Sequence, residues 1–517
     1  MRIRRDGEDA SGTGSSDRQD LQTAEAASDN ATGQPELSFW KKILPVMACG
    51  AGLFSDGYIN NVEAHCHDQV IGSVLTILAK EYKEVWTNST AKHYLPDIAF
   101  AGTVVGQLAF GYLSDKWSRT NSLLVSTIIL IVFTALTAGS YWHGDTVGMF
   151  NILTAWRFFV GIGIGGEYPA GSVGAAESTG SLKHGRRNMW FILFTNSMID
   201  WGFVIGAFVP YVVAAACQNK HLNTIWRTSL GIGVVFPLTL LGFRFYLREP
   251  EDFKKNSMKY AKTPYVLVLK YYGWRLFVVS LIWFIYDFST YSFGIYSSTI
   301  LANIYDGDKA PLTTIFGWNT VLNLFYIPGT MLGAPFSDLV GPKYALASGV
   351  TAQAIVGFIM AGCYPMLAKP SMVGAFVVVY GIFLALGEVG PGNNIGLLAA
   401  KSCATGVRGQ YYGVAAAIGK VGAFVGGFVF PYIIAAGGDS ENHSAQYPFY
   451  VSSSLCVLSA ALVLFGMPNI GQDTIQLEDA RFREYLTANG YDVRQLGLKK
   501  GEDVETVESA DSPSKLG

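Results

Sequence analysis

An acidic residue, Asp287, lies in the middle of the hydrophobic run 276–300, with Trp283 four residues before it and Tyr291 four residues after it. Residues spaced by four share one face of a helix, so an indole, a carboxylate and a phenol would point in one direction. A carboxylate at membrane depth is costly unless it faces a bundle interior or a water-filled pathway. This stripe therefore predicts a solute-binding surface inside a membrane protein.

Three further acidic residues, Asp56, Glu167 and Glu388, stand inside other apolar runs. A desolvated carboxyl group can take up a proton and release it, so these residues are candidates for proton coupling. For Asp56 the alternative is an acid bonded to hydroxyl groups of a neighbouring helix. For Glu167 it is a structural ion pair with Arg186 or Arg408. Another buried acid, Asp200, is a weaker candidate.

Lys420 lies well inside the apolar run 409–435. An ammonium group at that depth needs an anionic partner. We expect Asp287 or Glu388 to be the anionic partner of Lys420 when the site is empty. When the site is filled, we expect an anionic substrate to be the partner, because lysine binds phosphate as a compact charge. A purely structural ion pair is the alternative.

Glycine and proline interrupt two apolar runs, at 161–172 and at 387–394. The first contains a Gly-x-Gly-x-Gly-Gly string, but no strand precedes it, so it does not predict a dinucleotide site. Its glycines instead predict close packing against the first or second span. In the second run, Asn393 and Asn394 could offer amide donors to a phosphate oxygen; the alternative is a packing kink.

These residues need membrane helices to position them. A spanning helix requires about 20 mostly apolar residues, and the chain contains twelve such segments, at about 43–63, 96–114, 121–141, 148–174, 189–215, 225–247, 275–300, 315–337, 344–366, 372–398, 409–435 and 449–467. The sequence therefore predicts an all-α membrane protein with 12 transmembrane helices.

The two halves of the chain repeat. Gly111 to Arg119, after the second span, corresponds to Ala334 to Lys343 after the eighth. Gly166-Glu167 matches Gly387-Glu388, and Arg187 matches Arg408 before the fifth and eleventh spans. We therefore expect two six-helix pseudo-repeats around a central pathway. The predicted parts are an N-tail, an N-terminal bundle, a central loop, a C-terminal bundle and a C-tail, at 1–39, 40–247, 248–274, 275–468 and 469–517.

Basic residues gather in the loops of one side, which by the positive-inside rule is cytoplasmic, and both tails lie on that side. Two glycosylation sequons, at Asn88 and Asn442, then fall outside; a third, at Asn30, would be cytoplasmic and idle. A disulfide between Cys66 and Cys217 is possible.

Composition excludes several classes of protein. Half of the 517 residues are hydrophobic and 15% are charged, against roughly 25% charged in soluble domains. The net charge of −2 comes with no basic stripe, so we expect no nucleic-acid partner. The cysteines have no metal-binding spacing, and no nucleophile–base pair appears, so we expect neither a metal, a bound cofactor nor an enzyme.

The segment 111–119 resembles the loop between the second and third helices of the major facilitator superfamily, and the chain as a whole resembles the phosphate:proton symporter branch over about residues 40–470. The resemblance implies a cytoplasmic gate, with a simple polar turn as the alternative. The gate residues it implies are Asp115, Arg119, Arg187, Asp338 and Arg408.

The same resemblance implies a substrate site beside a proton pathway driven by the proton gradient. Positions matching Asp56 and Glu167 handle protons in that branch. The chain departs from inorganic phosphate carriers at Glu167, where they have Asp, and at Thr195-Asn196, where they have Gln. The implied substrate-binding residues are Tyr168, Trp283, Asp287, Tyr291, Asn393 and Lys420, and Asn196 is a further candidate at the position that departs.

The chain is more similar still to fungal glycerophosphodiester permeases. The matching stretches are Ser55–Tyr58, Ile225–Thr228, Tyr286–Phe288, Gly294–Ile300, Val407–Gly409, Tyr412–Gly413, Gly419–Lys420 and Phe482–Gly490. This resemblance implies a monomeric symporter of the plasma membrane that takes up small anionic organophosphates such as glycerophosphoinositol and glycerophosphocholine with protons. An inorganic phosphate:proton symporter and a non-transporting nutrient receptor are the alternatives.

Overall fold

Helices account for all of the predicted membrane segments, because only a helix satisfies every backbone polar group of a single span inside lipid. The structure is a computed structural model that describes residues 38–63, 73–89, 94–95, 97–304, 311–367, 369–438 and 440–498. The chain divides into two units, residues 1–42 and 43–517, and the second unit contains nearly all of the helical structure. All regular structure in its described residues is helical.

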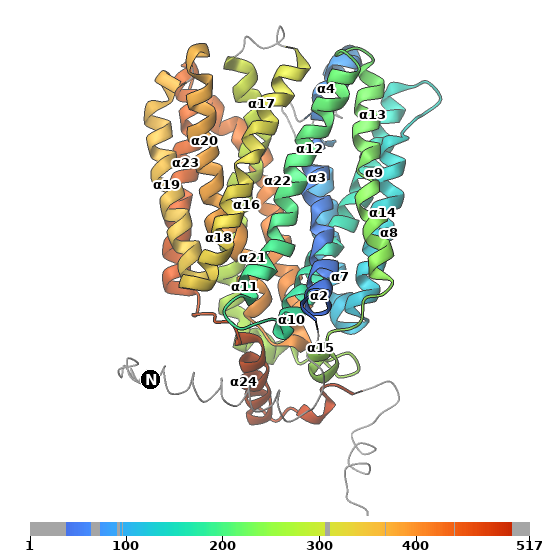
Figure 1. The fold of residues 1–517 in the computed structure, drawn as a ribbon, viewed down its shortest axis with the longest axis vertical. Helices are drawn as coiled ribbons and strands as arrows, with labels where there is room; N and C mark the ends of the chain where they lie inside the picture. The colour runs from blue at the N-terminus through green and yellow to red at the C-terminus, as the bar shows by residue number, and fades with distance from the viewer. Residues whose placement is uncertain are drawn as a thin grey trace, which may run out of the picture. The chain divides into compact units, whose positions relative to one another are not determined.

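The first predicted half contains six of the predicted spans (Figure 1). Two short helices, α4 and α5, follow the first span, and α10 ends the fourth. The helices are α2 (Phe39–Gly50), α3 (Phe54–Glu63), α4 (Ser73–Glu81), α5 (Lys83–Asn88), α7 (Ile98–Lys116), α8 (Arg119–Ala138), α9 (Thr146–Glu167), α10 (Val173–Ser178), α11 (Arg187–Phe194), α12 (Asn196–Ala216), α13 (Leu222–Ile232) and α14 (Val235–Arg244).

The second half repeats the pattern and ends with one further helix, α24 (Thr474–Ala488). A short helix, α15 (Glu251–Asn256), lies between the halves. The remaining helices are α16 (Tyr265–Ile304), α17 (Leu312–Leu324), α18 (Tyr326–Val340), α19 (Pro342–Leu367), α20 (Val373–Gly387), α21 (Asn393–Lys401), α22 (Arg408–Ala435) and α23 (Glu441–Gly466).

In the described part of the chain, nine helical stretches are long and apolar enough to cross a membrane. The helix α16 begins at Tyr265, well before the predicted span at 275–300. Its first turns contain Lys270, Trp274 and Arg275, so hydropathy locates the apolar part of this helix but not its polar start.

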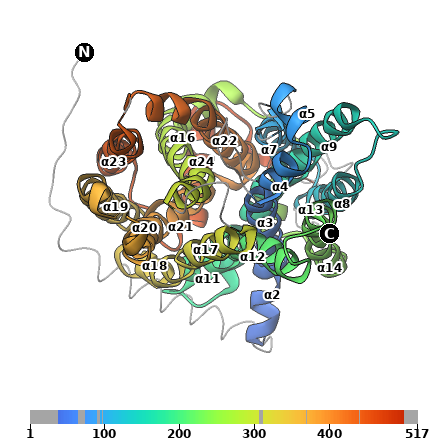
Figure 2. The ribbon, with the colours of Figure 1, turned by 90° about the horizontal axis from the view of Figure 1, so that it is seen from above.

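Helices pack within each half and also between the halves (Figure 2). In the first half α9 packs on α7 and α8, and α12 packs on α3; in the second, α22 packs on α16 and α23 on α19. The halves meet where α7 contacts α22, α12 contacts α17, and α11 contacts α18. A Cβ atom at Gly161 or Gly165 would collide with the backbone of α7, so the glycine string does form the predicted close-packing face.

The two interrupted runs form π-helical turns at equivalent places, Tyr168–Ser172 after α9 and Glu388–Gly392 after α20. Each contains a proline, Pro169 or Pro391, which lacks a backbone donor. Single π-turns occur mostly at functional sites, because they free backbone groups and re-aim side chains. Both turns contribute residues to a central cavity between the halves.

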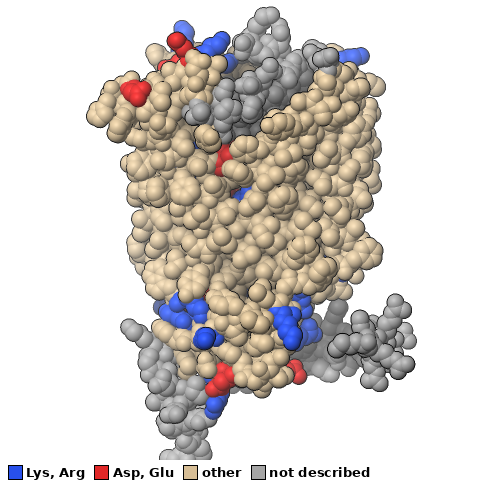
Figure 3. Space-filling model, turned by 180° about the vertical axis from the view of Figure 1, so that it is seen from behind, with Lys and Arg blue, Asp and Glu red and all other residues tan. Residues whose placement is uncertain are grey.

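Charged side chains lie mainly near the two ends of the helices (Figure 3). On the face shown, a broad band with very few charges separates them, and lysine and arginine gather at the end that carries α24. Such a band is what a bilayer core requires of a surface that faces lipid.

Candidate functional site

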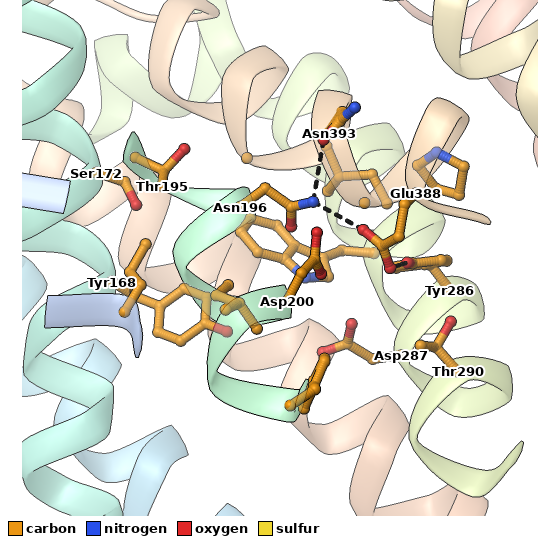
Figure 4. Close-up of a pocket in the computed structure, with 18 of the residues that line it drawn as sticks. Tyr168, Ser172, Thr195, Asn196, Asp200, Tyr286, Asp287, Thr290, Glu388 and Asn393 are labelled. Carbon is orange, nitrogen blue, oxygen red and sulfur yellow. Dashed lines mark hydrogen bonds between the residues drawn. The ribbon is translucent and has the colours of Figure 1, made fainter. Parts of the chain in front are cut away.

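The central cavity has a volume of about 60 Å³ (Figure 4). Helices α12 and α16 and the two π-turns supply most of its wall. Six of the predicted substrate-binding residues line it. They are Tyr168, Asn196, Trp283, Asp287, Tyr291 and Asn393.

The seventh predicted residue, Lys420, adjoins the cavity and is almost completely buried. Its Nζ lies 3.7 Å from Oδ2 of Asp287 and 3.8 Å from Oδ2 of Asp56. It also donates a hydrogen bond to the hydroxyl of Tyr291. The hydroxyl of Tyr168 in turn donates to Oδ2 of Asp56 at 2.5 Å. We call these five residues the lysine cluster.

The lysine cluster brings together residues from four membrane segments that lie far apart in the sequence. The predicted partner Asp287 is present and Asp56 is a second one, whereas no ion pair joins Lys420 to Glu388, both of which are described. The Nζ atom lies 3.9 Å from the ring centroid of Tyr291 and 5.1 Å from that of Tyr168. Aromatic faces attract a cation at this range, so the ammonium group is held from several sides.

A second group of polar residues surrounds Glu388. Its Oε2 accepts a hydrogen bond from Nδ2 of Asn196 at 2.7 Å, and its Oε1 accepts one from the hydroxyl of Tyr286 at 2.9 Å. The Asn196 amide also donates to Oδ1 of Asn393 at 3.0 Å, and Nδ2 of Asn393 donates to the carbonyl of Thr330. The Asn393 amide is therefore engaged with backbone in this arrangement.

The lysine cluster and the group around Glu388 are contacted by two different faces of α16. The predicted stripe of Trp283, Asp287 and Tyr291 faces the lysine cluster, and the indole of Trp283 stacks edge-on with Tyr412 at a centroid distance of 5.5 Å. The neighbouring positions Tyr286 and Thr290 face Glu388. One helix thus presents different chemistry to two parts of the same cavity.

Glu167 lies outside the cavity, in a buried ion pair with Arg244 of α14. Its carboxylate accepts hydrogen bonds from the guanidinium at 2.6 and 2.5 Å and one from the hydroxyl of Ser126 at 2.8 Å. The sequence predicts Arg186 or Arg408 as the alternative ion-pair partner of Glu167, and that choice of partner is wrong. Spacing along the chain cannot indicate that α14 packs against α8 and brings Arg244 next to Glu167, so in the sequence Arg244 is only a charge near a helix end.

Three of the predicted gate residues contact α24 or the residues just before it, since Asp338 bonds Gln472, Arg187 pairs with Asp473, and Arg408 lies 3.9 Å from Asp479. Asp115 accepts hydrogen bonds from the backbone amides of Gly409 at 2.9 Å and Gln410 at 2.8 Å, at the start of α22. Asp338 accepts from Asn188 at 3.1 Å and Met189 at 3.0 Å, at the start of α11. A carboxylate at a helix N-terminus complements the helix dipole.

Each of these acids therefore caps the fifth helix of the opposite half. Asp115 belongs to the first half and caps α22 of the second, and Asp338 does the reverse. The internal repeat of the sequence predicts that the two acids are equivalent. It does not predict that each acid caps a helix of the other half.

Buried arginines complete the gate. Arg119 bonds Asp115 at 2.6 Å and Glu177 at 3.1 Å, and Arg408 bonds the same Glu177 at 2.9 Å. Arg187 pairs with Asp473 in the segment before α24. Glu177 joins the halves, yet the sequence gives no signal for it, because it follows an apolar run and has no equivalent in the second repeat.

The segment from Gln472 to α24 also binds both halves. Gln472 accepts a hydrogen bond from the amide of Gly185 at 2.9 Å and donates one to Asp338 at 2.7 Å. Asp479 accepts from the backbone amide of Thr405 at 2.6 Å and from its hydroxyl at 2.7 Å. The C-terminal segment thus adds polar contacts to the closed end.

The remaining sequence-based expectations concern the periphery. Asn88 and Asn442 are both exposed, whereas Asn30 and Cys66 lie outside the described residues. Of the two cysteines in the disulfide prediction, only Cys217 is among the described residues, where it is a free thiol. Among the described residues, no cluster of His, Cys, Asp or Glu could hold a metal ion.

Comparison with known proteins places the chain in a family. The sugar (and other) transporter family matches residues 67–254 and 251–480. The chain belongs to the sugar (and other) transporter family. This is a family of transporters and not of enzymes.

Two relatives of this transporter come from Candida albicans. A glycerophosphocholine permease is 50% identical over 463 residues, covering 88% of this chain and 84% of the relative. A major glycerophosphoinositol permease is 46% identical over 490 residues, covering 94% and 88%. Among solved structures, the major facilitator superfamily proton:xylose symporter XylE matches with a TM-score of 0.69 at 16% identity, covering 87% of this chain and 100% of the symporter. The transporter therefore has the major facilitator fold that the internal repeat predicts.

Proposed function

We propose that this transporter takes up glycerophosphodiesters, such as glycerophosphocholine and glycerophosphoinositol, together with protons. The observation that carries the proposal is Lys420, a buried ammonium group next to a cavity. A diester phosphate has one negative charge, which a single lysine with phenol donors from Tyr168 and Tyr291 matches well. The two permeases from Candida albicans support the choice of substrate.

The surplus of acids supports the proposed proton coupling. Asp56 and Asp287 share one ammonium partner, so the lysine cluster has a formal charge of −1 before any substrate enters. An anionic substrate would add to this charge unless a carboxyl group is protonated. Asp56 and Glu388 are the proposed proton carriers, and both are buried beside the cavity. The pairing of Glu167 with Arg244 favours a structural role for that residue instead.

We place the protein in the plasma membrane as a monomer with both termini in the cytoplasm. The basic residues at the end carrying α24 support this orientation. In that orientation the gate closed by Asp115 and Asp338 faces the cytoplasm. Asn88 and Asn442 then face outside, where they are proposed glycosylation sites.

The cavity in this closed arrangement is far smaller than the roughly 300–1,000 Å³ of a ligand site. Substrate must therefore enter when the halves stand further apart. Transport would alternate between opening outside and opening at the gate, with the halves rocking about the cavity.

Uptake measurements test the proposal directly. Cells that lack their own transporters would express this chain and receive radiolabelled glycerophosphocholine, glycerophosphoinositol or inorganic phosphate. We expect accumulation of the diesters that a protonophore abolishes. If inorganic phosphate is taken up and blocks its own uptake at micromolar levels while the diesters do neither, the protein is a phosphate symporter.

A further inference from the structure

We propose that Asp200 and Glu388 form a second subsite, which binds the alkylammonium head group of a zwitterionic glycerophosphodiester such as glycerophosphocholine. The inference rests on the proposed function and deepens it, because it assigns the two ends of one substrate to two parts of the cavity. The lysine cluster takes the phosphate, and the acidic subsite takes the cation.

The first argument is uncompensated charge. Asp200 and Glu388 are 1% and 3% exposed, and both line the cavity. Within the described residues, neither forms an ion pair with any lysine, arginine or histidine; Lys420 pairs with Asp56 and Asp287 instead. Buried carboxylates are costly unless a cation or a proton neutralises them. A bound ammonium group would supply that cation.

The second argument is an open position on Asp200. Its Oδ2 accepts a hydrogen bond from the hydroxyl of Thr330, but its buried Oδ1 has no hydrogen-bond partner. A carboxylate oxygen without a partner in a cavity wall is a strong acceptor for a ligand. Figure 4 shows Asp200 on α12 pointing toward the space in front of Glu388.

The third argument is preorganisation. A chain of neutral hydrogen bonds runs from Glu388 through Asn196 and Asn393 to Thr330, whose hydroxyl reaches Asp200. These partners hold both carboxylates in place without adding positive charge. A rigid acidic pair can attract a cation without first breaking an internal salt bridge.

The fourth argument is the aromatic wall. A smaller cavity adjoins the first and shares Tyr286, Thr290 and Glu388 with it. Its other lining residues include the rings of Phe293, Tyr326 and Phe383. Aromatic rings around an acidic residue are the usual surroundings of a quaternary ammonium group in proteins. A trimethylammonium group can use ring faces and carboxylates, whereas a neutral inositol ring would leave both carboxylates without a counter-ion.

The head-group preference tests the inference by a change in selectivity. We would measure kcat/KM for glycerophosphocholine and glycerophosphoinositol in the full-length wild type and in Asp200→Asn. The wild type should transport glycerophosphocholine, and Asp200→Asn should lower the ratio of the two values about tenfold. Asp97→Asn removes a buried carboxylate that lines neither cavity, and it should leave the ratio unchanged.

A substrate analogue gives a second readout that needs no variant. The 3,3-dimethylbutyl ester of glycerophosphate has the shape of glycerophosphocholine without its positive charge. It should inhibit wild-type uptake of glycerophosphoinositol about tenfold more weakly than glycerophosphocholine does. If Asp200→Asn does not reach the cell surface, this comparison decides alone.

The possible outcomes separate the two proposals. Equal inhibition by the charged ester and its neutral analogue, or an unchanged ratio in Asp200→Asn, would overturn the subsite while diester uptake stands. Transport of glycerophosphoinositol without any glycerophosphocholine would do the same. If the wild type takes up neither diester, the proposed function itself fails.

Discussion

The closed gate and the central cavity both concentrate buried charge, but they balance it in opposite ways. At the gate each acid has a basic or backbone amide partner. The capping acid of the first half, Asp115, has an equivalent in the second half, Asp338. In the cavity and its lysine cluster, the described residues Asp56, Asp200, Asp287 and Glu388 lie near one described base, Lys420, and the arrangement does not repeat.

The difference indicates what each region is for. A region whose charges satisfy one another holds two surfaces together, and it works equally well when duplicated. A region with surplus charge is incomplete until a proton or a ligand arrives. We therefore propose that the symmetric gate contacts belong to the parts that move and that the asymmetric cavity is the substrate site.

Removing the single base of the lysine cluster should have the largest effect. Lys420→Ala leaves Asp56 and Asp287 as neighbouring acids with no cation, so we expect uptake to fall by about two orders of magnitude, in line with a loss of some 3 kcal/mol of binding. Asp287→Asn should act similarly. Radiolabelled uptake, normalised to surface protein, measures both.

Tyr432→Phe is a suitable control for these two variants, because Tyr432 lies on the same helix as Lys420 but is strongly exposed. It should transport normally. If Lys420→Ala takes up substrate as fast as the wild type at equal surface expression, Lys420 is not part of the substrate site. The contrast drawn between the gate and the cavity would then be wrong.

The next largest effect concerns the buried ion pair of Glu167 and Arg244. As at the gate, each charge in this pair is neutralised by its partner. Arg244→Ala leaves an uncompensated carboxylate, and breaking such a pair costs about 3–5 kcal/mol. We expect a large loss of folded protein, measured by thermal unfolding in detergent. The double variant Glu167→Leu/Arg244→Met removes both charges and should recover most of that loss.

The same double variant tests the proton role that the sequence predicts for Glu167. We expect accumulation driven by the proton gradient and counterflow exchange to recover together. Recovery of counterflow without accumulation would show that Glu167 carries a proton after all.

The gate acids should have a moderate effect, larger for Asp115 because it also pairs with Arg119 at 2.6 Å. Asp115→Asn and Asp338→Asn each weaken charged hydrogen bonds to a helix start, each worth about 1.5 kcal/mol or more. Opening should then become about tenfold easier. The buried thiol of Cys403, which lies beside Arg408, would report opening through its rate of labelling in a chain without other cysteines. A larger effect of Asp338→Asn than of Asp115→Asn would contradict this difference in their partners.

Much of this arrangement could be predicted from the sequence, because lipid imposes strong local rules. Apolar length locates the spans, and the spacing of Trp283, Asp287 and Tyr291 correctly puts three side chains on one wall of the cavity. The equivalence of Asp115 and Asp338 follows from repeated local segments. In each case the information lies within a few turns of one helix.

Long-range partners could not be predicted in the same way. Glu167 meets Arg244 and Asp115 meets the start of α22 only because helices distant in sequence pack together. Hydropathy treats Arg244 as a charge at the end of a span, and it treats Glu177 as an interruption. Asp200 is only a weak candidate in the sequence, because its open oxygen and the aromatic wall beside it appear only in three dimensions.

The smallest effect is expected where the C-terminal segment joins the gate. Asp479→Asn keeps one acceptor for the amide of Thr405 but loses the negative charge 3.9 Å from Arg408. We expect Cys403 labelling to rise only about twofold, or about 0.4 kcal/mol, since this pair is long and Arg408 keeps its bond to Glu177 at 2.9 Å. Combined with Asp115→Asn, the change should exceed the product of the single effects, because both residues hold the same helix start. Simple multiplication of the two effects would mean that Asp479 and Asp115 stabilise the closed arrangement independently of each other.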